Sequence, residues 1–189
     1  MMIKAARDAD QVVGKPKLGG PFSLIDQDGK PTTDADFRGK FMLVYFGFTN
    51  CPDVCPEELE KMAAALDALE PAQSAKVTPL FISVDPKRDT VAAVRSYVKE
   101  FHPRLIGLTG TYPDVKAAAK AYRVYFSSPP PEEQTDEDYL VDHSIFFYLM
   151  DPQGGFVDAY GKNLTIEQMV SRTQRHIREW ETSNGAIPA

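Results

Sequence analysis

The sequence predicts an α/β protein built on one open sheet, and three observations favour this class. Apolar strand-like runs alternate with segments whose apolar residues recur at the three- and four-residue spacing of helices. The two strongest runs, residues 41–46 and 77–84, are apolar almost throughout, which is typical of strands covered on both faces. The length of 189 residues suits one domain, and 43% apolar residues are enough for a core.

The first elements are a polar lead-in and a hairpin. Residues 1–18 are polar and mixed in charge, so we expect a loose N-terminal segment. Residues 22–25 and 31–33 are predicted as short strands, because Asp28-Gly29 between them is a strong turn signal. The first central strand, residues 41–46, follows this hairpin.

The middle of the chain repeats the order helix, strand, helix. A helix is predicted over residues 57–69, because its apolar residues fall on one face and Pro56 suits its first turn. Residues 77–84 form the second buried strand, and Asp89 or Thr90 is expected to cap the helix that follows.

The second half contains short elements and one irregular segment. Short strands at residues 105–108 and 124–126 flank a helix that begins near Thr111. Residues 127–138 hold three consecutive prolines and five acidic residues. We interpret them as an exposed acidic loop inserted late in the fold, with a docking surface as the alternative.

The chain closes with a hairpin at residues 145–150 and 156–160 and a helix over residues 165–181. We therefore expect one domain over residues 19–182 and a frayed tail over residues 183–189. This order of elements is the thioredoxin-like three-layer plan, with an N-terminal β-hairpin added in front. In that plan the cysteines fall at the C-terminal edge of a strand, where open α/β sheets bind ligands.

Charge and hydropathy argue against two classes of function. The chain has 21 basic and 27 acidic residues, so no basic field attracts nucleic acid. No apolar run reaches the length of a membrane span, and the N-terminus shows neither a signal core nor a transit pattern. We expect either a cytosolic protein or a soluble piece of something longer, and a monomer.

The chemistry of the chain is expected at its only two cysteines, Cys51 and Cys55. A disulfide between them would close so small a loop that it would stabilise the fold little. They lie where a strand passes through a short turn into a helix, and a helix start is expected to lower thiol pKa. Such thiolates can exchange disulfides or bind a soft metal, copper(I) or zinc; an iron–sulfur cluster would need further cysteines.

A third metal ligand would have to come from another residue type, and the histidines are the first candidates. His102 lies at a helix end, where it complements the dipole, and His176 lies among arginines as an expected surface residue. His143 opens the strand at residues 145–150, in the loop that faces the cysteines in a thioredoxin plan. Position alone leaves a ligand and an ordinary side chain equally favoured there; Asp142 could support a ligand.

Several motifs extend over residues 19–160: YFGFTNCPDVCPEELEKM, PLFISVDPKRDT, GLTGT, AYRVYFS and DYLVDHSIFFYLMDP. Together they resemble the Sco (synthesis of cytochrome c oxidase) family, and its mitochondrial members more closely than its bacterial ones. The pattern C-P-x-x-C-P with a distal D-H-S before a strand is highly specific.

The resemblance implies a protein that binds one copper ion, Cu+ foremost and Cu2+ possible in principle, through Cys51, Cys55 and His143. It implies a metallochaperone for the copper-A site of cytochrome c oxidase subunit II, loaded by a small soluble copper chaperone of the intermembrane space. It also implies an N-terminal anchor in the mitochondrial inner membrane, with the domain facing the intermembrane space. That helix is absent from this sequence, as expected for a soluble fragment.

Three alternatives remain beside the metallochaperone. A thiol–disulfide oxidoreductase would keep the subunit II cysteines reduced, with Cys51 attacking and Cys55 resolving, so enzymatic activity stays an open question. A peroxiredoxin-type peroxidase is disfavoured, because Phe48 and Pro52 stand where Thr or Ser would activate the peroxide. A catalytic zinc site ranks lower still, because no Glu in a recognisable motif accompanies the cysteines.

Overall fold

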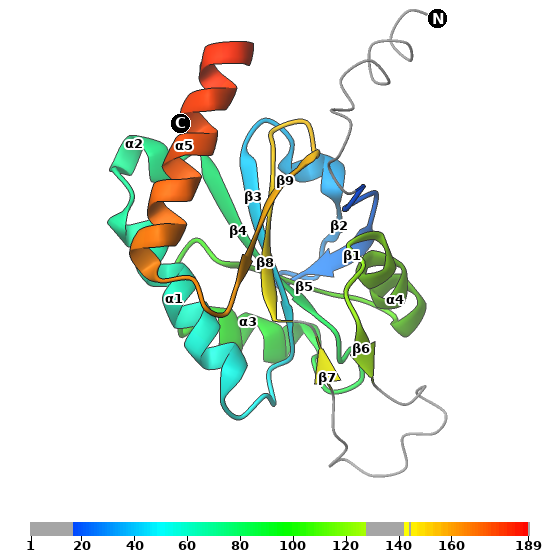
Figure 1. Cartoon of the computed structure of the whole chain (residues 1–189). Helices are drawn as coiled ribbons and strands as arrows, with labels where there is room; N and C mark the ends of the chain where they lie inside the picture. The colour runs from blue at the N-terminus through cyan, green and yellow to red at the C-terminus, as the bar shows by residue number, and fades with distance from the viewer. Residues whose placement is uncertain (1–16, 128–141, 144, 189) are drawn as a thin grey trace, which may run out of the picture.

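The computed structural model describes residues 17–127, 142–143 and 145–188. These residues form a seven-stranded sheet with helices on both faces and a separate two-stranded sheet at one end (Figure 1). The elements are, in chain order, β1 (Ser23–Asp26), β2 (Pro31–Thr33), the 3-10 helix η1 (Asp34–Phe37), β3 (Phe41–Gly47), α1 (Val54–Ala68), α2 (Pro71–Ser74), β4 (Val77–Ser83), α3 (Val91–Lys99), β5 (Ile106–Thr109), α4 (Tyr112–Ala121), β6 (Phe126–Ser127), β7 (Asp142–His143), β8 (Phe146–Met150), β9 (Phe156–Gly161) and α5 (Ile166–Asn184).

The large sheet has the strand order β2-β1-β5-β4-β3-β8-β9. Strands β3, β4 and β5 are parallel, whereas β8 and β9 run antiparallel beside β3. The predicted N-terminal hairpin is confirmed, and its strand β1 pairs antiparallel with β5. The hairpin therefore extends the central sheet. The order confirms the predicted thioredoxin-like plan with an added hairpin.

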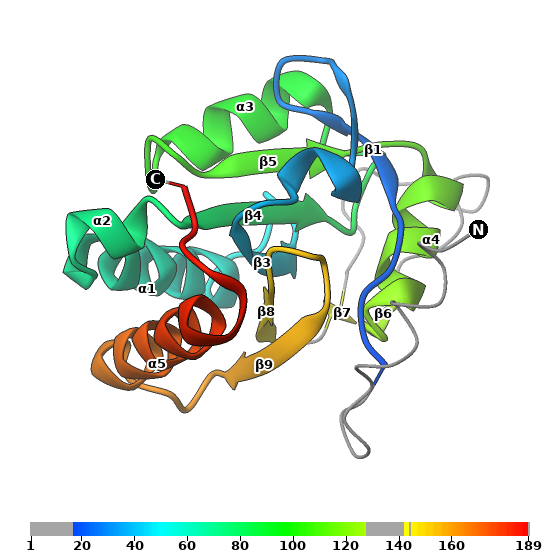
Figure 2. The same ribbon diagram turned by 90° about the horizontal axis from the view of Figure 1, so that it is seen from above.

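Alternate residues of β3 face two different layers of helices, as the pleat of a strand requires. On one face Phe41 contacts Trp180 of α5, with ring centroids 6.2 Å apart. On the other face the ring of Phe46 lies 5.3 Å from that of Tyr122, at the end of α4. Figure 2 shows α1, α3 and α5 on one side of the sheet and α4 on the other. Since β3 is buried along its whole length, it is the centre of the core.

The predicted central strands are confirmed as β3 and β4, and the structure decides the cap of α3. The Thr90 hydroxyl accepts a hydrogen bond from the backbone N–H of Ala93 at 3.2 Å. Of the two predicted caps, Thr90 is therefore the right one. Asp89, the other candidate, is buried and takes a different role in the functional site.

Most predicted bounds are shifted by one to three residues, and three differences have a local cause or were not expected. Helix α1 begins at Val54 and includes Cys55, because a proline in the first turn loses only an N–H that has no helical partner there. The short helix α2, which begins at Pro71, was not predicted. Strand β6 begins two residues late, because Arg123 has a φ of 52° and the N–H of Val124 donates back to α4.

The last helix extends beyond its predicted end. Helix α5 runs to Asn184, and Ile187 beyond it is buried, with its N–H donating to the Glu181 carboxylate at 3.3 Å. Most of the predicted lead-in and of the acidic loop, residues 1–16 and 128–141, lies outside the described residues.

Candidate dithiol metal site

The two cysteines lie at the C-terminal end of β3, as the sequence predicts. Cys51 follows the turn that leaves β3, and Cys55 lies in the first turn of α1. Both thiols are reduced and buried, with exposed fractions of 8% for Cys51 and 0% for Cys55. Cys51 is therefore the thiol that is closer to solvent.

The sulfur of Cys55 lies in a closely fitted space. The Tyr45 hydroxyl donates to Cys55 Sγ at 3.6 Å, and the backbone N–H of Phe48 also donates to this sulfur. The Cys55 thiol itself donates to Cys51. A Cβ atom at Gly47 would lie 2.9 Å from the same sulfur, which real Cβ contacts do not tolerate. The strand must therefore end in glycine for Cys55 to occupy this position.

The electrostatics of Cys55 oppose ionisation. Its pKa is raised, first by the hydrogen bond with Cys51 and then by burial, while the contacts from Phe48 and Tyr45 act in the lowering direction. The prediction of a lowered thiol pKa is therefore wrong for Cys55. The helix start would lower the pKa, but the nearby sulfur of Cys51 and burial raise it by more, because both disfavour a negative charge on Cys55.

A buried carboxylate fixes the loop between β3 and Cys51. Asp89 accepts from the backbone N–H of Thr49 at 3.0 Å and from its hydroxyl at 2.6 Å. Asp89 also accepts from the hydroxyl of Ser83 on β4 at 2.6 Å. Burial raises the pKa of Asp89, and these hydrogen bonds partly oppose the rise. The segment after β4 thus holds the segment after β3 in place.

The backbone of His143 lies at the same edge of the sheet as the cysteines. Strand β8 runs antiparallel to β3 with Tyr45 opposite Phe147, so the residues before β8 lie beyond the end of β3. His143 itself is in β7, where it pairs with Phe126 of β6. It therefore belongs to a separate short ladder. The prediction that His143 opens the strand at residues 145–150 is wrong, because that strand, β8, begins at Phe146. Its side chain is outside the described part of the structure.

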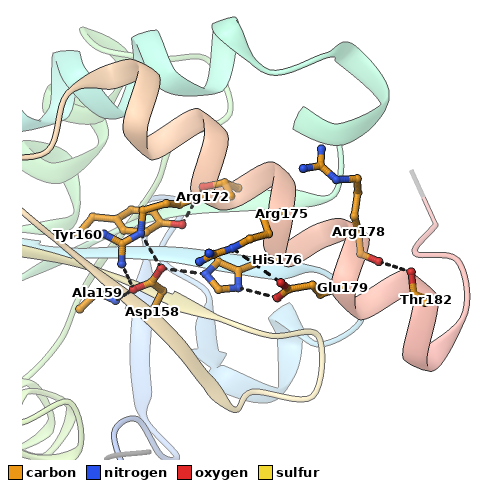
Figure 3. A network of polar contacts seen from close by, with 10 residues as sticks. Asp158, Ala159, Tyr160, Arg172, Arg175, His176, Arg178, Glu179 and Thr182 are labelled. Carbon is orange, nitrogen blue, oxygen red and sulfur yellow. Dashed lines mark hydrogen bonds and ion pairs between the residues drawn. The ribbon is translucent and has the colours of Figure 1, made fainter.

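The other two histidines are engaged elsewhere. His102 Nε2 lies 3.1 Å from the carboxylate of Asp67, in the last turn of α1 and far from its first turn. His176 Nε2 lies 2.8 Å from Asp158 (Figure 3), and its side chain is only 12% exposed. The prediction of His176 as a surface residue is therefore wrong, because β9 covers it. Neither histidine reaches the cysteines.

The donor atoms of the site suit a soft cation. Two sulfur ligands favour copper(I) or zinc over hard cations. Among the side chains that the structure describes, no group of three His, Cys, Asp or Glu residues could hold a metal ion. A third ligand of these four types would therefore come from a side chain that the structure does not describe. The backbone of His143 lies at the same edge of the sheet as the cysteines.

Sequence reasoning missed Tyr45, Gly47 and the loop-holding role of Asp89. Gly47 carried a signal, since a glycine at the end of an otherwise bulky buried strand indicates a close approach. Tyr45 carried none, because one aromatic residue in an apolar strand looks like any other core residue. Asp89 carried none, because the Thr49 that it holds is 40 residues away along the chain.

Fold and site together define a thioredoxin-like protein with a buried cysteine pair between a central strand and its helix. A family model described as SCO1/SenC matches residues 10–178, and the chain belongs to this family. This confirms the resemblance stated from the motifs.

Several proteins with names or solved structures are similar to this chain in sequence. The chain is 51% identical over 157 residues to "Protein sco1" of Schizosaccharomyces pombe, covering 83% of this chain and 60% of that protein. It is 49% identical over 178 residues to human "Protein SCO1 homolog, mitochondrial", covering 94% and 58%. The crystal structure of Arabidopsis thaliana ScoI with copper bound shares 52% identity and a TM-score of 0.79, covering 86% of this chain and 99% of that one.

The chain spans about 60% of the length of the curated relatives just described. Among the residues that the structure describes, no helix is both long and apolar enough to cross a membrane.

Proposed function

We propose that this chain is a copper metallochaperone domain that serves the copper-A site of cytochrome c oxidase subunit II. It binds one copper ion, Cu+ foremost, through Cys51, Cys55 and His143. The observation that carries the proposal is the buried, reduced pair of thiols at the strand–helix junction of a SCO1/SenC family member. The copper-bound structure of the Arabidopsis relative supports the choice of metal.

The site chemistry fits release as well as binding. Two thiolates and one imidazole form a site of low coordination number, which suits copper(I) and leaves room for the thiolate of an acceptor. Transfer then proceeds by ligand exchange, with acceptor thiolates replacing Cys51 and Cys55 one at a time. Because the pKa of Cys55 is raised, copper displaces a proton from this thiol, so acid conditions weaken binding.

The cellular setting is part of the same proposal. The domain acts in the intermembrane space as a monomer, tethered to the mitochondrial inner membrane by a segment outside this sequence. A small soluble copper chaperone of that compartment loads it. The mitochondrial name of the human relative supports this location.

An anaerobic titration of the fully reduced protein with copper(I), against a competing chelator, tests the site. We expect one tight equivalent, weakened about tenfold or more in His143→Ala, which corresponds to about 1.4 kcal/mol. His102→Ala is the matched control, because His102 contacts Asp67 away from the cysteines, and it should bind like the wild type. Absence of tight binding, or equal binding in His143→Ala, contradicts the proposal.

A second function is supported by the pairing of the two thiols. Cys51 and Cys55 are reduced and hydrogen-bonded to each other, the arrangement from which a thiol–disulfide oxidoreductase would act. Cys51, the more exposed thiol, would attack an oxidised subunit II disulfide, and Cys55 would resolve the mixed disulfide. Cys55→Ser should then trap a mixed disulfide with oxidised subunit II, and Cys51→Ser should not. Failure to trap in both variants removes this function.

A further inference from the structure

We propose that a basic, aromatic groove beside the His143 strand is the docking surface for an acidic face of the protein that accepts copper from this domain. The proposal rests on the proposed function and adds the surface and the charge of its partner. The groove is formed by α4, the turn after it and β6, with a volume of about 560 Å³. Its polar and aromatic lining residues are Tyr112, Lys116, Lys120, Arg123, Tyr125 and Phe126.

The charge of the groove differs from that of the protein. The chain has a formal net charge of −6, yet three cations, Lys116, Lys120 and Arg123, line this one surface. None of the three forms an ion pair with a carboxylate among the described residues. Lys116 instead lies over the ring of Tyr112, with Nζ 6.0 Å from the centroid. Such a cluster attracts carboxylates of a partner and steers its approach.

One exposed large apolar side chain lines this groove, and a second follows His143 closely in the sequence. Within the described part of the chain, the exposed large hydrophobic residues are Tyr125, at 66%, and Phe146, at 46%. Tyr125 directly precedes β6, and Phe146 begins β8, three residues after His143. Exposed aromatic residues beside cations are typical of protein–protein interfaces, where tyrosine and arginine supply much of the binding energy.

The groove is continuous with the strand that carries the proposed copper ligand. Phe126 lines the groove, and in the β6–β7 ladder the same residue pairs with His143. A partner seated on Tyr125 and Phe126 therefore lies beside the backbone of His143. Docking there would bring acceptor thiols to the edge of the sheet where Cys51 emerges.

The test is the rate of copper(I) transfer from the loaded protein to the reduced copper-A domain of subunit II, measured by stopped flow. Lys116→Glu/Lys120→Glu reverses two groove charges on exposed positions of α4. We expect the second-order rate at low ionic strength to fall about tenfold, because steering of this kind changes association rates by that order or more. The loss should largely disappear at about 1 M salt, where the Debye length is about 3 Å.

Two further variants make the result specific. Arg175→Glu/Arg178→Glu imposes the same change in net charge on exposed positions of α5, and its transfer rate should stay near that of the wild type. Tyr125→Ser should slow transfer at low and at high salt, since it removes an apolar contact. Transfer to a small chelator should be unchanged in all three variants, because they leave the cysteines intact.

Several outcomes would overturn the docking surface. Equal slowing in the groove and α5 variants would show a general effect of net charge. If Lys116→Glu/Lys120→Glu no longer binds vesicles of phosphatidylcholine with cardiolipin, as the wild type does, but transfers copper at the wild-type rate, the groove would be assigned to a membrane. A loss of thermal stability in Lys116→Glu/Lys120→Glu, again with transfer intact, would assign it to the chain's own acidic residues 132–138.

Failure of the proposed function is distinguishable from failure of the docking surface. If the wild type binds no copper, the metal-free reduced proteins can still be mixed and their affinity measured by calorimetry. Weaker association of Lys116→Glu/Lys120→Glu with subunit II, but not of Arg175→Glu/Arg178→Glu, would then retain the surface. Normal copper binding with normal transfer in the groove variant would remove the surface alone.

Discussion

Gly47 and Cys55 share one small space at the end of β3. The absence of a side chain at residue 47 lets the sulfur of Cys55 approach the strand, and Tyr45 and Phe48 bond to that sulfur from the same strand and turn. The cysteine is thus held by groups that precede it in the sequence by ten residues or fewer. At this scale the site is local, and a single methyl group is enough to disturb it.

Gly47→Ala tests that fit. The new Cβ would lie 2.9 Å from Cys55 Sγ and 3.1 Å from the ring of Phe81. Overpacking of this kind typically lowers the free energy of unfolding by about 1–3 kcal/mol, and we expect weaker copper binding besides. Denaturant unfolding and the copper titration measure the two effects.

Gly20→Ala is the control for this change. A Cβ there would lie 3.5 Å from the Cβ of Ala121, an ordinary contact, so the free energy of unfolding should stay within about 0.5 kcal/mol of wild type. Wild-type stability and copper affinity in Gly47→Ala would contradict the close fit between residue 47 and Cys55 Sγ.

Between elements, the loop after β4 controls the loop after β3. Asp89 joins Thr49, two residues before Cys51, to Ser83 at the end of β4. The parallel pairing of these two strands brings the loops together, with Gly47 opposite Ser83. A carboxylate buried with three donors is costly to remove, because the buried donors lose the acceptor that they share.

Asp89→Ala should therefore loosen the cysteine loop. We expect a loss of about 1–3 kcal/mol in the free energy of unfolding, since buried donors are left unsatisfied. Amide exchange at Thr49 should become faster, and copper binding weaker. Ser83→Ala keeps both bonds between Asp89 and Thr49, so it should leave the exchange rate of Thr49 unchanged. Undiminished protection of the Thr49 amide in Asp89→Ala would refute the role of this carboxylate.

For the whole molecule, the attachment of α5 to β9 links stability to pH. Asp158 on β9 accepts from Arg172 Nε at 3.0 Å and from His176 Nε2 at 2.8 Å (Figure 3). Arg172 also lies over the ring of Tyr160, 5.1 Å from its centroid. Burial acts to raise the pKa of Asp158, but the hydrogen bonds from His176 and Arg172 outweigh it and lower the pKa below its ordinary value.

A lowered carboxyl pKa has a defined sign for stability. The unfolded Asp158 has a pKa of about 3.9, so its contribution is complete above that pH and is lost as the pH falls through the lower folded value. Asp158→Asn should reduce the free energy of unfolding at pH 7 by about 1–3 kcal/mol, as expected for hydrogen bonds to a charged group. The difference from wild type should shrink below about pH 4.

Urea unfolding at several pH values measures this dependence. Asp28→Asn is the control, because Asp28 is 62% exposed and its pair with Arg95 is 3.5 Å long. Exposed pairs contribute about 0–1 kcal/mol, so this variant should unfold like the wild type. A constant difference between Asp158→Asn and wild type from pH 7 down to pH 3 would contradict the assignment.

The sequence by itself determined the class of the fold and the chemistry of the cysteines. Apolar runs report strands such as β3 and β4, and spaced apolar residues report helices, because burial of a face depends on local periodicity. Cys51 and Cys55 were identified as the reactive pair since no other residues of the chain offer thiolates. Motif resemblance supplied the family, which the comparison with known proteins confirms.

Only the tertiary structure decided how the pair is held. The raised pKa of Cys55, the tie from Asp89 to Thr49 and the burial of His176 by β9 all depend on contacts between segments that are remote in sequence or on the depth of burial. Hydrogen bonding and desolvation act through space, and no pattern along the chain records which distant groups will meet. The basic groove beside β6 is a product of the same packing, because the end of α4 and the aromatic residues after it form one surface only in the folded protein.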